Sequence, residues 1–365
     1  MGTKLEQAAR VSAAEPAAID AAEAALASGD FQAALDAVRA LGGPRDRCLR
    51  IEVSALLELG DVSAAETRAT ELVDLVKTSG SDPAASADAI LLLGRARYRA
   101  AAFPDAAALF SEALEQCDRS LESADALRAD VLGWRARSYR RMRLWAAAQS
   151  DLDLALGLAR DLGDDRLTAN LSFQSSLLAE RTGQTLMASV YAEQARDLYE
   201  SLGDTRSLAR ILNNLGGLNW LLGQHEVAFE HLRKAFELAT EADSPTDAAQ
   251  AISSLAHVLL GDGQPEPAEK AARHAIELLV GRIDYVEELG NASLVLGRSL
   301  LAQERWDEAR EALAEAEKHF TQVSATSAIA ATLVVRGDIS RRTNDLEQAA
   351  DLYRAAADLL HDYRF

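Results

Sequence analysis

Large apolar residues along the chain recur at helical spacing, and small residues interrupt them at regular places. In residues 212–239 the large apolar positions lie three or four residues apart, which predicts one helix before Gly223 and a second helix after it. These positions are Leu215, Leu218, Leu222, Phe229, Leu232 and Phe236. Gly216, Ala228 and Ala235 stand among them, and an interior glycine costs a helix about 1 kcal/mol relative to alanine. We infer that the small residues mark a close crossing of two helices, with the larger side chains filling the grooves around it.

The same small residues recur along nearly the whole chain. The six-residue stretch from Gly223 to Ala228 has counterparts in GDFQAA, GDVSAA, GQTLMA and GQPEPA. Its last residue belongs to a ladder of nine alanines, spaced by 31 residues once and then by 40 to 42. The ladder is Ala34, Ala65, Ala106, Ala148, Ala188, Ala228, Ala268, Ala309 and Ala349. A second ladder of mostly small residues lies twelve positions earlier and a third lies seven positions later. Three ladders in one phase predict nine units, each a helix, a short turn and a second helix.

Turn signals fall between the two helices of each predicted unit. Gly223 can end a first helix, and a large apolar residue such as Trp145 or Trp306 opens a second. Pro104 and Pro265 fall in that opening turn, where a helix tolerates proline. We therefore interpret both tryptophans as structural.

This arrangement resembles the tetratricopeptide repeats, a family with small residues at positions 8, 20 and 27 of its unit and glycine near position 15. Gly216, Gly223, Ala228 and Ala235 match those positions. The resemblance covers roughly residues 15–365 and implies an all-α fold, a right-handed superhelical solenoid of about nine helical hairpins. The period is about 40 residues here, against 34 in the usual repeat. In this it is similar to kinesin light chains, the Leu-Gly-Asn repeat proteins and the sensor region of MalT-like bacterial regulators.

The step lengths divide the chain into three parts. Residues 1–14 are an N-terminal segment, residues 15–76 are two atypical short units, and residues 77–365 are seven units of about 40 residues that continue from that pair. Val53 stands at the small position of the second unit, which fits its atypical assignment.

The last predicted unit ends without an additional polar helix. We expect it to expose apolar residues such as Leu352, Tyr353 and Leu360. Such an end should be covered by a second copy, which would give a homodimer, by another partner or by further residues.

Composition and charge exclude several classes of protein. The net charge of −19 should repel nucleic acid and anionic membrane surfaces, so we expect no direct contact with either. The N-terminus lacks an apolar signal segment, and the longest uncharged run, residues 320–335, is too short and polar to span a bilayer. A cytoplasmic location is the expectation. Cys48 and Cys117 have no partner motif, so we interpret them as small buried residues or inert thiols.

No motif for nucleophilic, metal-dependent or nucleotide-dependent chemistry occurs in the sequence. The six histidines have no repeated spacing with cysteines or carboxylates. Asp151 and Asp153 lie two positions apart and cannot share one helix face. We therefore expect no enzymatic activity, no catalytic residue, no metal and no cofactor.

Binding residues are expected on the first helix of each unit. In the resembled family, positions 2, 6, 9 and 13 of that helix face the concave groove, and their spacing makes one stripe. The candidates on this face are Arg95, Arg99, Trp134, Arg137, Arg141, Asn170, Gln174, Arg181, Arg210, Asn213, Asn214 and His257. Residues 128–143 contain six arginines against Asp130 alone, which favours an anion site in the third and fourth units, because arginine grips carboxylates in a two-pronged fork. Alternatively, these arginines pair with acidic residues of neighbouring helices or stay solvated.

Several of these candidates have a second interpretation. Asn213 and Asn214 either bind the backbone of an extended peptide or bond across helices within the solenoid. Trp134 and Trp220 either line an apolar pocket or belong to the core. His257 alone does not identify a site.

Two functions are compatible with these observations. The first is a non-catalytic scaffold whose groove binds a protein or peptide that is acidic or carries a free C-terminal carboxylate. The alternative, implied by the MalT-like resemblance, is a ligand- or peptide-sensing module of a bacterial helix-turn-helix transcription regulator. No helix-turn-helix or ATPase segment is recognisable in the chain itself.

Overall fold

The computed structural model describes residues 16–41, 45–120, 124–281 and 285–361, and these residues form helices and turns without a strand. The first helix covers residues 16–28. It is followed by α2 (Phe31–Leu41), α3 (Asp46–Leu59), α4 (Val62–Ser79), α5 (Pro83–Arg99), α6 (Phe103–Arg119), α7 (Asp125–Arg141), α8 (Trp145–Asp161) and α9 (Asp165–Arg181). The second half contains α10 (Thr185–Ser201), α11 (Thr205–Leu221), α12 (His225–Glu241), α13 (Pro245–Gly261), α14 (Pro265–Leu279), α15 (Val286–Ala302), α16 (Trp306–Gln322), α17 (Thr326–Arg342) and α18 (Leu346–His361).

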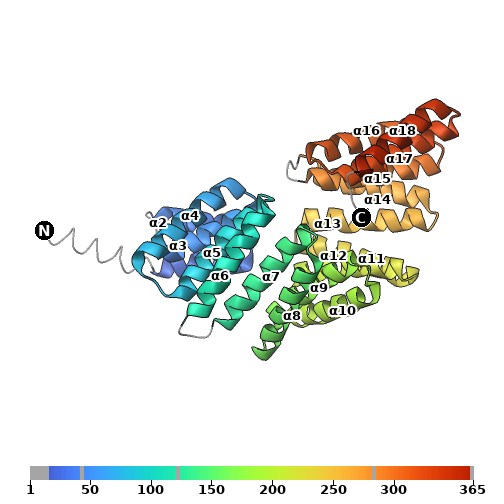
Figure 1. Cartoon of the computed structure of the whole chain (residues 1–365). Helices are drawn as coiled ribbons and strands as arrows, with labels where there is room; N and C mark the ends of the chain where they lie inside the picture. The colour runs from blue at the N-terminus through green and yellow to red at the C-terminus, as the bar shows by residue number, and fades with distance from the viewer. Residues whose placement is uncertain (1–15, 42–44, 121–123, 282–284, 362–365) are drawn as a thin grey trace. The chain divides into compact units, whose positions relative to one another are not determined.

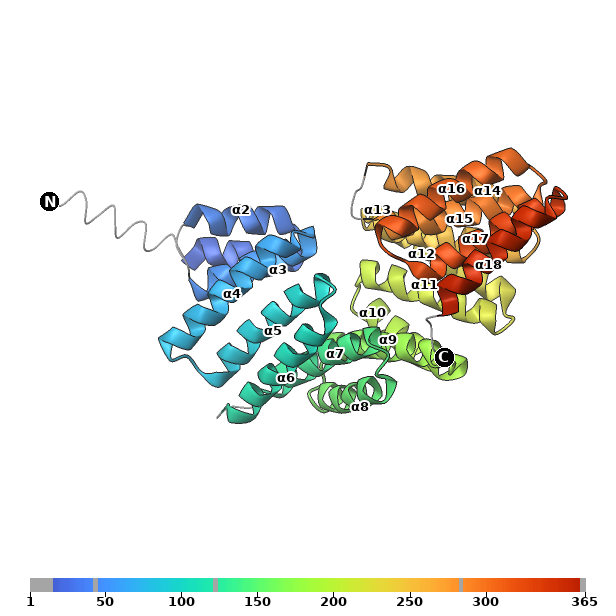
Figure 2. The ribbon, with the colours of Figure 1, turned by 45° about the horizontal axis from the view of Figure 1, so that its top comes forward.

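The helices form two compact units, and the boundary along the chain falls in the turn between α9 and α10. Unit 1 runs to Thr182 and unit 2 begins at Gly183. Within each unit, consecutive helices pack side by side as a stack of hairpins (Figures 1 and 2). The first helices of successive hairpins also pack directly on one another, namely α3, α5, α7 and α9 in unit 1 and α11, α13, α15 and α17 in unit 2. Second helices of successive hairpins do so far less, so the first helices form the inner row of each unit.

The small-residue ladders lie where hairpin helices cross, as the sequence predicts. The nine ladder alanines from Ala34 to Ala349 are at most 3% exposed. A Cβ atom added to Gly94 would lie 2.5 Å from Cε1 of Phe110, and one added to Gly297 would lie 2.6 Å from Cγ of Leu313. Phe110 and Leu313 each stand four residues after a ladder alanine, so the same packing recurs in different hairpins.

The turn inside each hairpin contains one residue with left-handed backbone geometry. Gly223, between α11 and α12, has a φ of +75°, which glycine adopts without steric cost. The same turn position is occupied by a non-glycine residue with positive φ in four hairpins, namely at Ala101, Arg143, Glu304 and Asn344. Trp145 and Trp306 begin the second helices α8 and α16, which confirms their structural position.

The all-α fold class is thereby confirmed. Residues 1–14 lie outside the described residues, and the division of the chain at residues 76 and 77 stays a prediction. At the end of the chain, Leu352 and Tyr353 are half-buried, and the Tyr353 hydroxyl donates to Oδ1 of Asp338 on α17 (2.8 Å). Leu360 is 40% exposed. Leu360 is therefore exposed as expected, whereas Leu352 and Tyr353 are partly covered. A homodimer through this end stays a prediction.

Candidate functional site

The inner row of unit 1 holds two arginines against one tryptophan. On α7, the guanidinium carbon of Arg137 lies 4.2 Å from the centre of the Trp134 ring. The guanidinium carbon of Arg95, on α5, lies 5.0 Å from the same ring. Asp130, one turn before Trp134 on α7, is close enough to interact electrostatically with both arginines. We call Arg95, Asp130, Trp134 and Arg137 the arginine–tryptophan cluster.

Helix geometry explains why these residues meet. Asp130, Trp134 and Arg137 are spaced by four and three residues, so they share one face of α7. The Trp134 ring is held edge-on by Tyr98 of α5, with ring centres 5.6 Å apart, and also contacts Phe110. Trp134 is therefore both a packing residue and the platform on which the arginines lie.

The charged groups of this cluster are partly desolvated. Burial lowers the pKa of both Arg95 and Arg137, although the Asp130 charge opposes that effect. Burial likewise raises the pKa of Asp130, and the two arginines oppose it. Within the described parts of the chain, Arg137 has no ion pair or side-chain hydrogen bond, and Nε of Arg95 has no hydrogen-bond partner. The fold thus leaves donors of both arginines without a partner among the described residues.

The other arginines of α5 and α7 differ in their partners. Glu58 of α3 accepts from Arg95 at 3.5 Å and lies 3.8 Å from Nη2 of Arg99. Arg141 is exposed, with its guanidinium carbon 4.9 Å from the Phe103 ring centre. Arg135, in contrast, forms a two-pronged ion pair with the buried Asp151, so part of the arginine-rich run is structural.

Helix α9 contributes fewer accessible groups than predicted. Asn170 and Arg181 are exposed, and the charge of Arg181 helps to lower the pKa of Arg140 after the larger effect of burial. Gln174 is buried, and its side-chain oxygen has no hydrogen-bond partner among the described residues. Asn170 and Arg181 thus extend the polar inner surface of unit 1, whereas Gln174 lies beneath it.

In unit 2, the candidates on α11 belong partly to the scaffold. Nε of Arg210 donates to Oδ1 of Asp247 (2.8 Å), so Arg210 is engaged with α13. Asn213 and Asn214 are half-buried, and the Asn213 side-chain oxygen has no hydrogen-bond partner in the described chain. The Trp220 ring stacks on His225, with ring centres 4.1 Å apart. The same ring packs against Gly261 on α13, where an added Cβ atom would lie 2.6 Å from Cζ2 of Trp220. Trp220 therefore packs between two hairpins.

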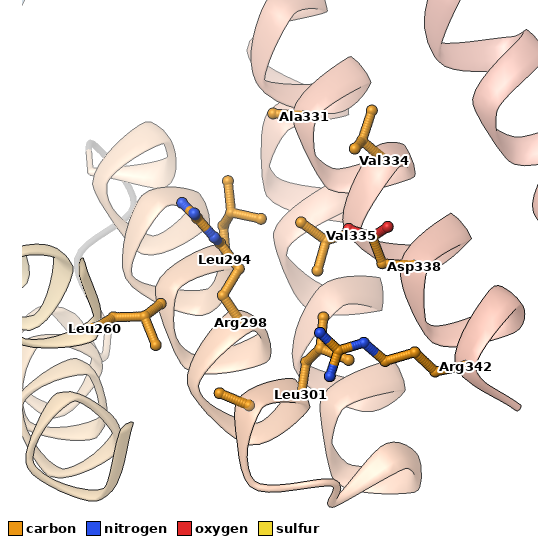
Figure 3. Close-up of a pocket in the computed structure, with 10 residues that line it drawn as sticks. Leu260, Leu294, Arg298, Leu301, Ala331, Val334, Val335, Asp338 and Arg342 are labelled. Atoms are coloured by element: carbon orange, nitrogen blue, oxygen red, sulfur yellow. The ribbon is translucent and has the colours of Figure 1, made fainter. Parts of the chain in front are cut away.

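Unit 2 also contains a pocket that the sequence analysis did not identify. It has a volume of about 490 Å³ and is formed by the inner row of α13, α15 and α17 (Figure 3). Its lining residues are Leu260, Leu294, Arg298, Leu301, Ala302, Ala331, Val334, Val335, Asp338 and Arg342. His257, a predicted candidate, lies near this pocket: burial lowers its pKa first, and the charge of Arg298 lowers it further.

The signal that could have revealed the pocket is the position rule itself. Counted from Gly297 and Gly337 at position 8, Arg298 and Asp338 occupy position 9 and Arg342 occupies position 13. The position rule that gives the candidates on the earlier first helices therefore also selects these three polar residues of α15 and α17.

The described residues offer neither a cluster of metal ligands nor a membrane-spanning helix. No group of three or more His, Cys, Asp or Glu side chains is arranged to hold a metal ion in these ranges. No described helix has the length and apolar character required to cross a membrane.

The fold and the inner-row residues together define a class of protein, the all-α proteins built from stacked helical hairpins. In this class the first helices of the hairpins line one surface of the stack. Family models for the tetratricopeptide repeat match residues 52–120, 207–279 and 294–361, which together make up more than half of the chain. The chain belongs to the tetratricopeptide-repeat family. A search of curated protein sequences gave no significant match.

Solved structures with the same fold include a quorum sensor, a gene regulator and a signal transduction ATPase. The apo quorum sensor NprR from B. thuringiensis is 17% identical, with a TM-score of 0.65 over 94% of this chain and 98% of that one. The Rap conjugation gene regulator of plasmid pLS20, in complex with a Phr peptide, is 15% identical, with a TM-score of 0.60 over 95% of both chains. A signal transduction ATPase with a tetratricopeptide repeat sensor from Pyrococcus horikoshii is 13% identical, with a TM-score of 0.67 over 91% of this chain and 50% of that one. At these identities the likeness concerns the fold.

Proposed function

We propose that the protein is a non-catalytic scaffold that binds a peptide or protein segment on the inner row of first helices, with an anion-binding stripe in the third and fourth units. The observation that carries the proposal is the arginine–tryptophan cluster, in which Arg137 lies on Trp134 without an ion-pair partner among the described residues. Partly desolvated arginines interact with a carboxylate more strongly than solvated ones, because the surrounding dielectric constant is lower.

The ligand class follows from this chemistry. The cluster carries Arg95 and Arg137 against Asp130, and Glu58 pairs with Arg95 and Arg99. The exposed Arg141 adds further positive charge at the end of α7, so the stripe keeps a net positive charge. A segment rich in Asp or Glu, or one with a free C-terminal carboxylate, fits this surface. The peptide complex of the Rap regulator of plasmid pLS20 supports a peptide as ligand, because that protein has the same fold.

A charge-reversal experiment tests the proposal. Affinity capture from the source cell's lysate, with the wild-type protein and with Arg137→Glu plus Arg141→Glu, should recover a partner with the first and lose it with the second. Circular dichroism should show equal helicity for both proteins. Because a glutamate beside Asp130 adds like-charge repulsion, Arg137→Gln plus Arg141→Gln provides a milder variant that should also lose the partner.

The matched control reverses two arginines on outer surfaces. Arg119 and Arg233 are exposed by 63% and 73% and lie on the second helices α6 and α12. Arg119→Glu plus Arg233→Glu changes the net charge by the same amount and should retain the partner. Normal capture by the Arg137 and Arg141 variants would remove the stripe from the proposal.

A regulatory sensor is a second candidate, because two proteins with this fold are a quorum sensor and a signal transduction ATPase with a tetratricopeptide repeat sensor. In this reading the same inner row binds a ligand or peptide and relays its presence to a DNA-binding or ATPase segment. Sequencing the intact gene and its neighbourhood tests it. A helix-turn-helix or ATPase segment encoded in frame favours the sensor, and a reading frame without either favours the scaffold.

A further inference from the structure

A second groove of unit 2 lies on the outer surface, away from the inner row. The second helices α14 and α16 flank it, and the first helix α15 forms its base, because α14 and α16 both pack on α15 (Figure 1). Its volume of about 300 Å³ is at the lower end of the range for ligand pockets, roughly 300 to 1,000 Å³. The groove can therefore hold one or two side chains of a partner.

The floor of this outer groove is mainly apolar. Leu289, Ser293, Leu296 and Leu300 line it and are spaced by four, three and four residues, so they share one face of α15. Leu296 and Leu300 are buried, whereas Leu289 and the adjoining Ile276 of α14 are half-buried. An aliphatic chain that enters the groove would leave water and contact this floor.

The wall formed by α16 is acidic. Glu308, Glu311 and Glu315 line the groove at spacings of three and four residues, at which like charges on a helix repel one another. These glutamates stand one residue before, two after and six after the ladder alanine Ala309. The same positions of the other second helices in unit 2 hold Met187, Val190 and Gln194, then Val227, Glu230 and Lys234, then Pro267, Lys270 and His274, and finally Gln348, Asp351 and Ala355. The repeat therefore does not require three acidic residues here.

The arginine that lines the groove is already paired. Nε of Arg273, on α14, donates to Oε1 of Glu269 (2.9 Å), and its Nη2 lies 3.7 Å from Oε2 of Glu308. Glu308 also accepts from Nε of Arg305 (2.8 Å). The charges at this end of the groove are thus balanced.

The middle of the acidic wall differs. Glu311 is exposed and has no ion pair or side-chain hydrogen bond within the described ranges. Glu315 accepts from Nζ of Lys318 (2.9 Å) and lies 3.9 Å from Nε2 of His319. More than half of both side chains in the Glu315–Lys318 pair is exposed, so that pair holds its members weakly. A cation in the groove would meet a free carboxylate at Glu311.

The pairing of α15 with α16 places this carboxylate beside the apolar floor. Gly290 packs against Phe320 and Gly297 packs against Leu313, so the two helices run antiparallel. In this register Leu296 lies level with the stretch between Glu311 and Glu315. A ligand group can therefore touch the floor and the free carboxylate together.

We propose that this outer groove binds an arginine side chain from a segment of a partner protein, with its methylene stem on Leu289 and Leu296 and its guanidinium on Glu311. Arginine combines an apolar stem with a charged end, so one residue satisfies both parts of the groove. Its planar guanidinium forms two parallel bonds with a carboxylate and is less strongly hydrated than an ammonium group, which favours arginine over lysine. This interaction surface goes beyond the proposed function, which uses the inner row.

Methyl NMR of the full chain tests the proposal, because it detects weak binding and locates it. Protein with isotope-labelled Ile and Leu methyl groups is titrated with N-acetyl-arginine methylamide, with its neutral citrulline analogue and with an analogue whose stem is shorter by two methylenes. The Ile276, Leu289 and Leu296 signals should shift and saturate with the arginine compound. Its dissociation constant should be lower than that of the citrulline analogue by about fivefold or more, because the charge is lost. It should be lower than that of the short analogue by about threefold or more, because less apolar surface is buried.

Variants of the free carboxylate test its role. Glu311→Gln should weaken binding of the arginine compound about fivefold to tenfold, and Glu311→Lys should abolish the saturable shifts. Since Glu311 is exposed, both variants should melt like wild type. Glu230→Gln is the matched control, because Glu230 is exposed at the same repeat position of α12 but stands between Val227 and Lys234. It should bind the arginine compound like wild type.

Four results would overturn the proposal. They are equal affinity for the arginine and citrulline compounds, unchanged binding by Glu311→Gln, shifts confined to inner-row methyl groups, and no saturable shift at all. Dimerisation of the wild-type chain that Glu311→Lys removes, measured by sedimentation, would assign the groove to a second copy and would equally overturn a separate partner. The Arg137→Glu plus Arg141→Glu variant should bind the arginine compound normally, because it alters unit 1 alone. The two proposals therefore fail separately.

Discussion

Single glycines set the distance between the two helices of a hairpin. Gly216 lies in the interior of α11, and a Cβ atom there would overlap the side chain of Leu232 on α12. Its neighbour Gly217 is also helical but exposed, with nothing within 4 Å of an added Cβ atom. Both residues are glycines in the interior of α11, so they have the same helix propensity and differ only in how closely other side chains pack against them.

This difference predicts opposite effects of the same substitution. Gly216→Ala should lower the free energy of unfolding by about 1–3 kcal/mol, because overpacking outweighs the gain in helix propensity. Gly217→Ala should raise it by about 0.5–1 kcal/mol, because alanine is the better helix former. Urea denaturation of both variants measures the two effects. A stabilised Gly216→Ala protein would show that the close crossing is not required.

At the scale of elements, an ion-pair network joins α11 to α13. Asp247, in the first turn of α13, accepts from Nε of Arg210 (2.8 Å), Nε of Arg206 (3.0 Å) and Oγ of Ser244 (2.6 Å). Burial opposes ionisation of Asp247, but Arg210 and the hydrogen bonds from Ser244 and Arg206 outweigh it and lower the pKa of the carboxyl. The ionised carboxylate therefore stabilises the folded state.

Removal of this carboxylate should destabilise the protein in a pH-dependent way. Asp247→Ala should lower the free energy of unfolding at pH 7 by about 1.5–3 kcal/mol, the range for hydrogen bonds to charged groups. Because the folded pKa is lowered, the contribution is complete above the unfolded pKa and is lost as pH falls through the folded value.

Urea denaturation at pH 7 and at pH 3 should therefore show a smaller difference between Asp247→Ala and wild type at the lower pH. Asp358→Ala, an exposed change on α18, is the control and should have an effect within about 0.5 kcal/mol. A pH-independent difference for Asp247→Ala would contradict the assigned role.

For the whole molecule, the sequence determined the fold more completely than the binding surface. The small-residue ladders have nine copies, so the assignment of a residue to a packing position in one unit is supported by the equivalent residues in the other units. Binding residues occur once each, and their partners come from other hairpins. Arg135 and Arg137 are two positions apart, yet one pairs with the buried Asp151 and the other lies on Trp134.

Distant partners also explain what the sequence analysis missed. Arg210 occupies a groove position, but Asp247 engages it from 37 residues away. The pocket of unit 2 is lined by one arginine from α15 and one from α17, 44 positions apart, so no arginine-rich run marks it. His257, a predicted candidate, lies near this pocket, where burial lowers its pKa and the charge of Arg298 from the next hairpin lowers it further. The spacing of residues along the sequence identifies which side chains share a helix face. Ion pairs and hydrogen bonds to other helices, which the spacing does not reveal, decide which of those side chains remain available to a ligand.

Hydrogen–deuterium exchange of the full chain, with and without the partner recovered by affinity capture, tests binding on the inner row most directly. We expect the partner to slow exchange in α5 and α7, which hold the arginine–tryptophan cluster, and to leave the second helices α6 and α8 unchanged. The same protection should be absent from Arg137→Glu plus Arg141→Glu. Protection confined to α6 and α8, or equal protection in that variant, would contradict a binding surface on the first helices.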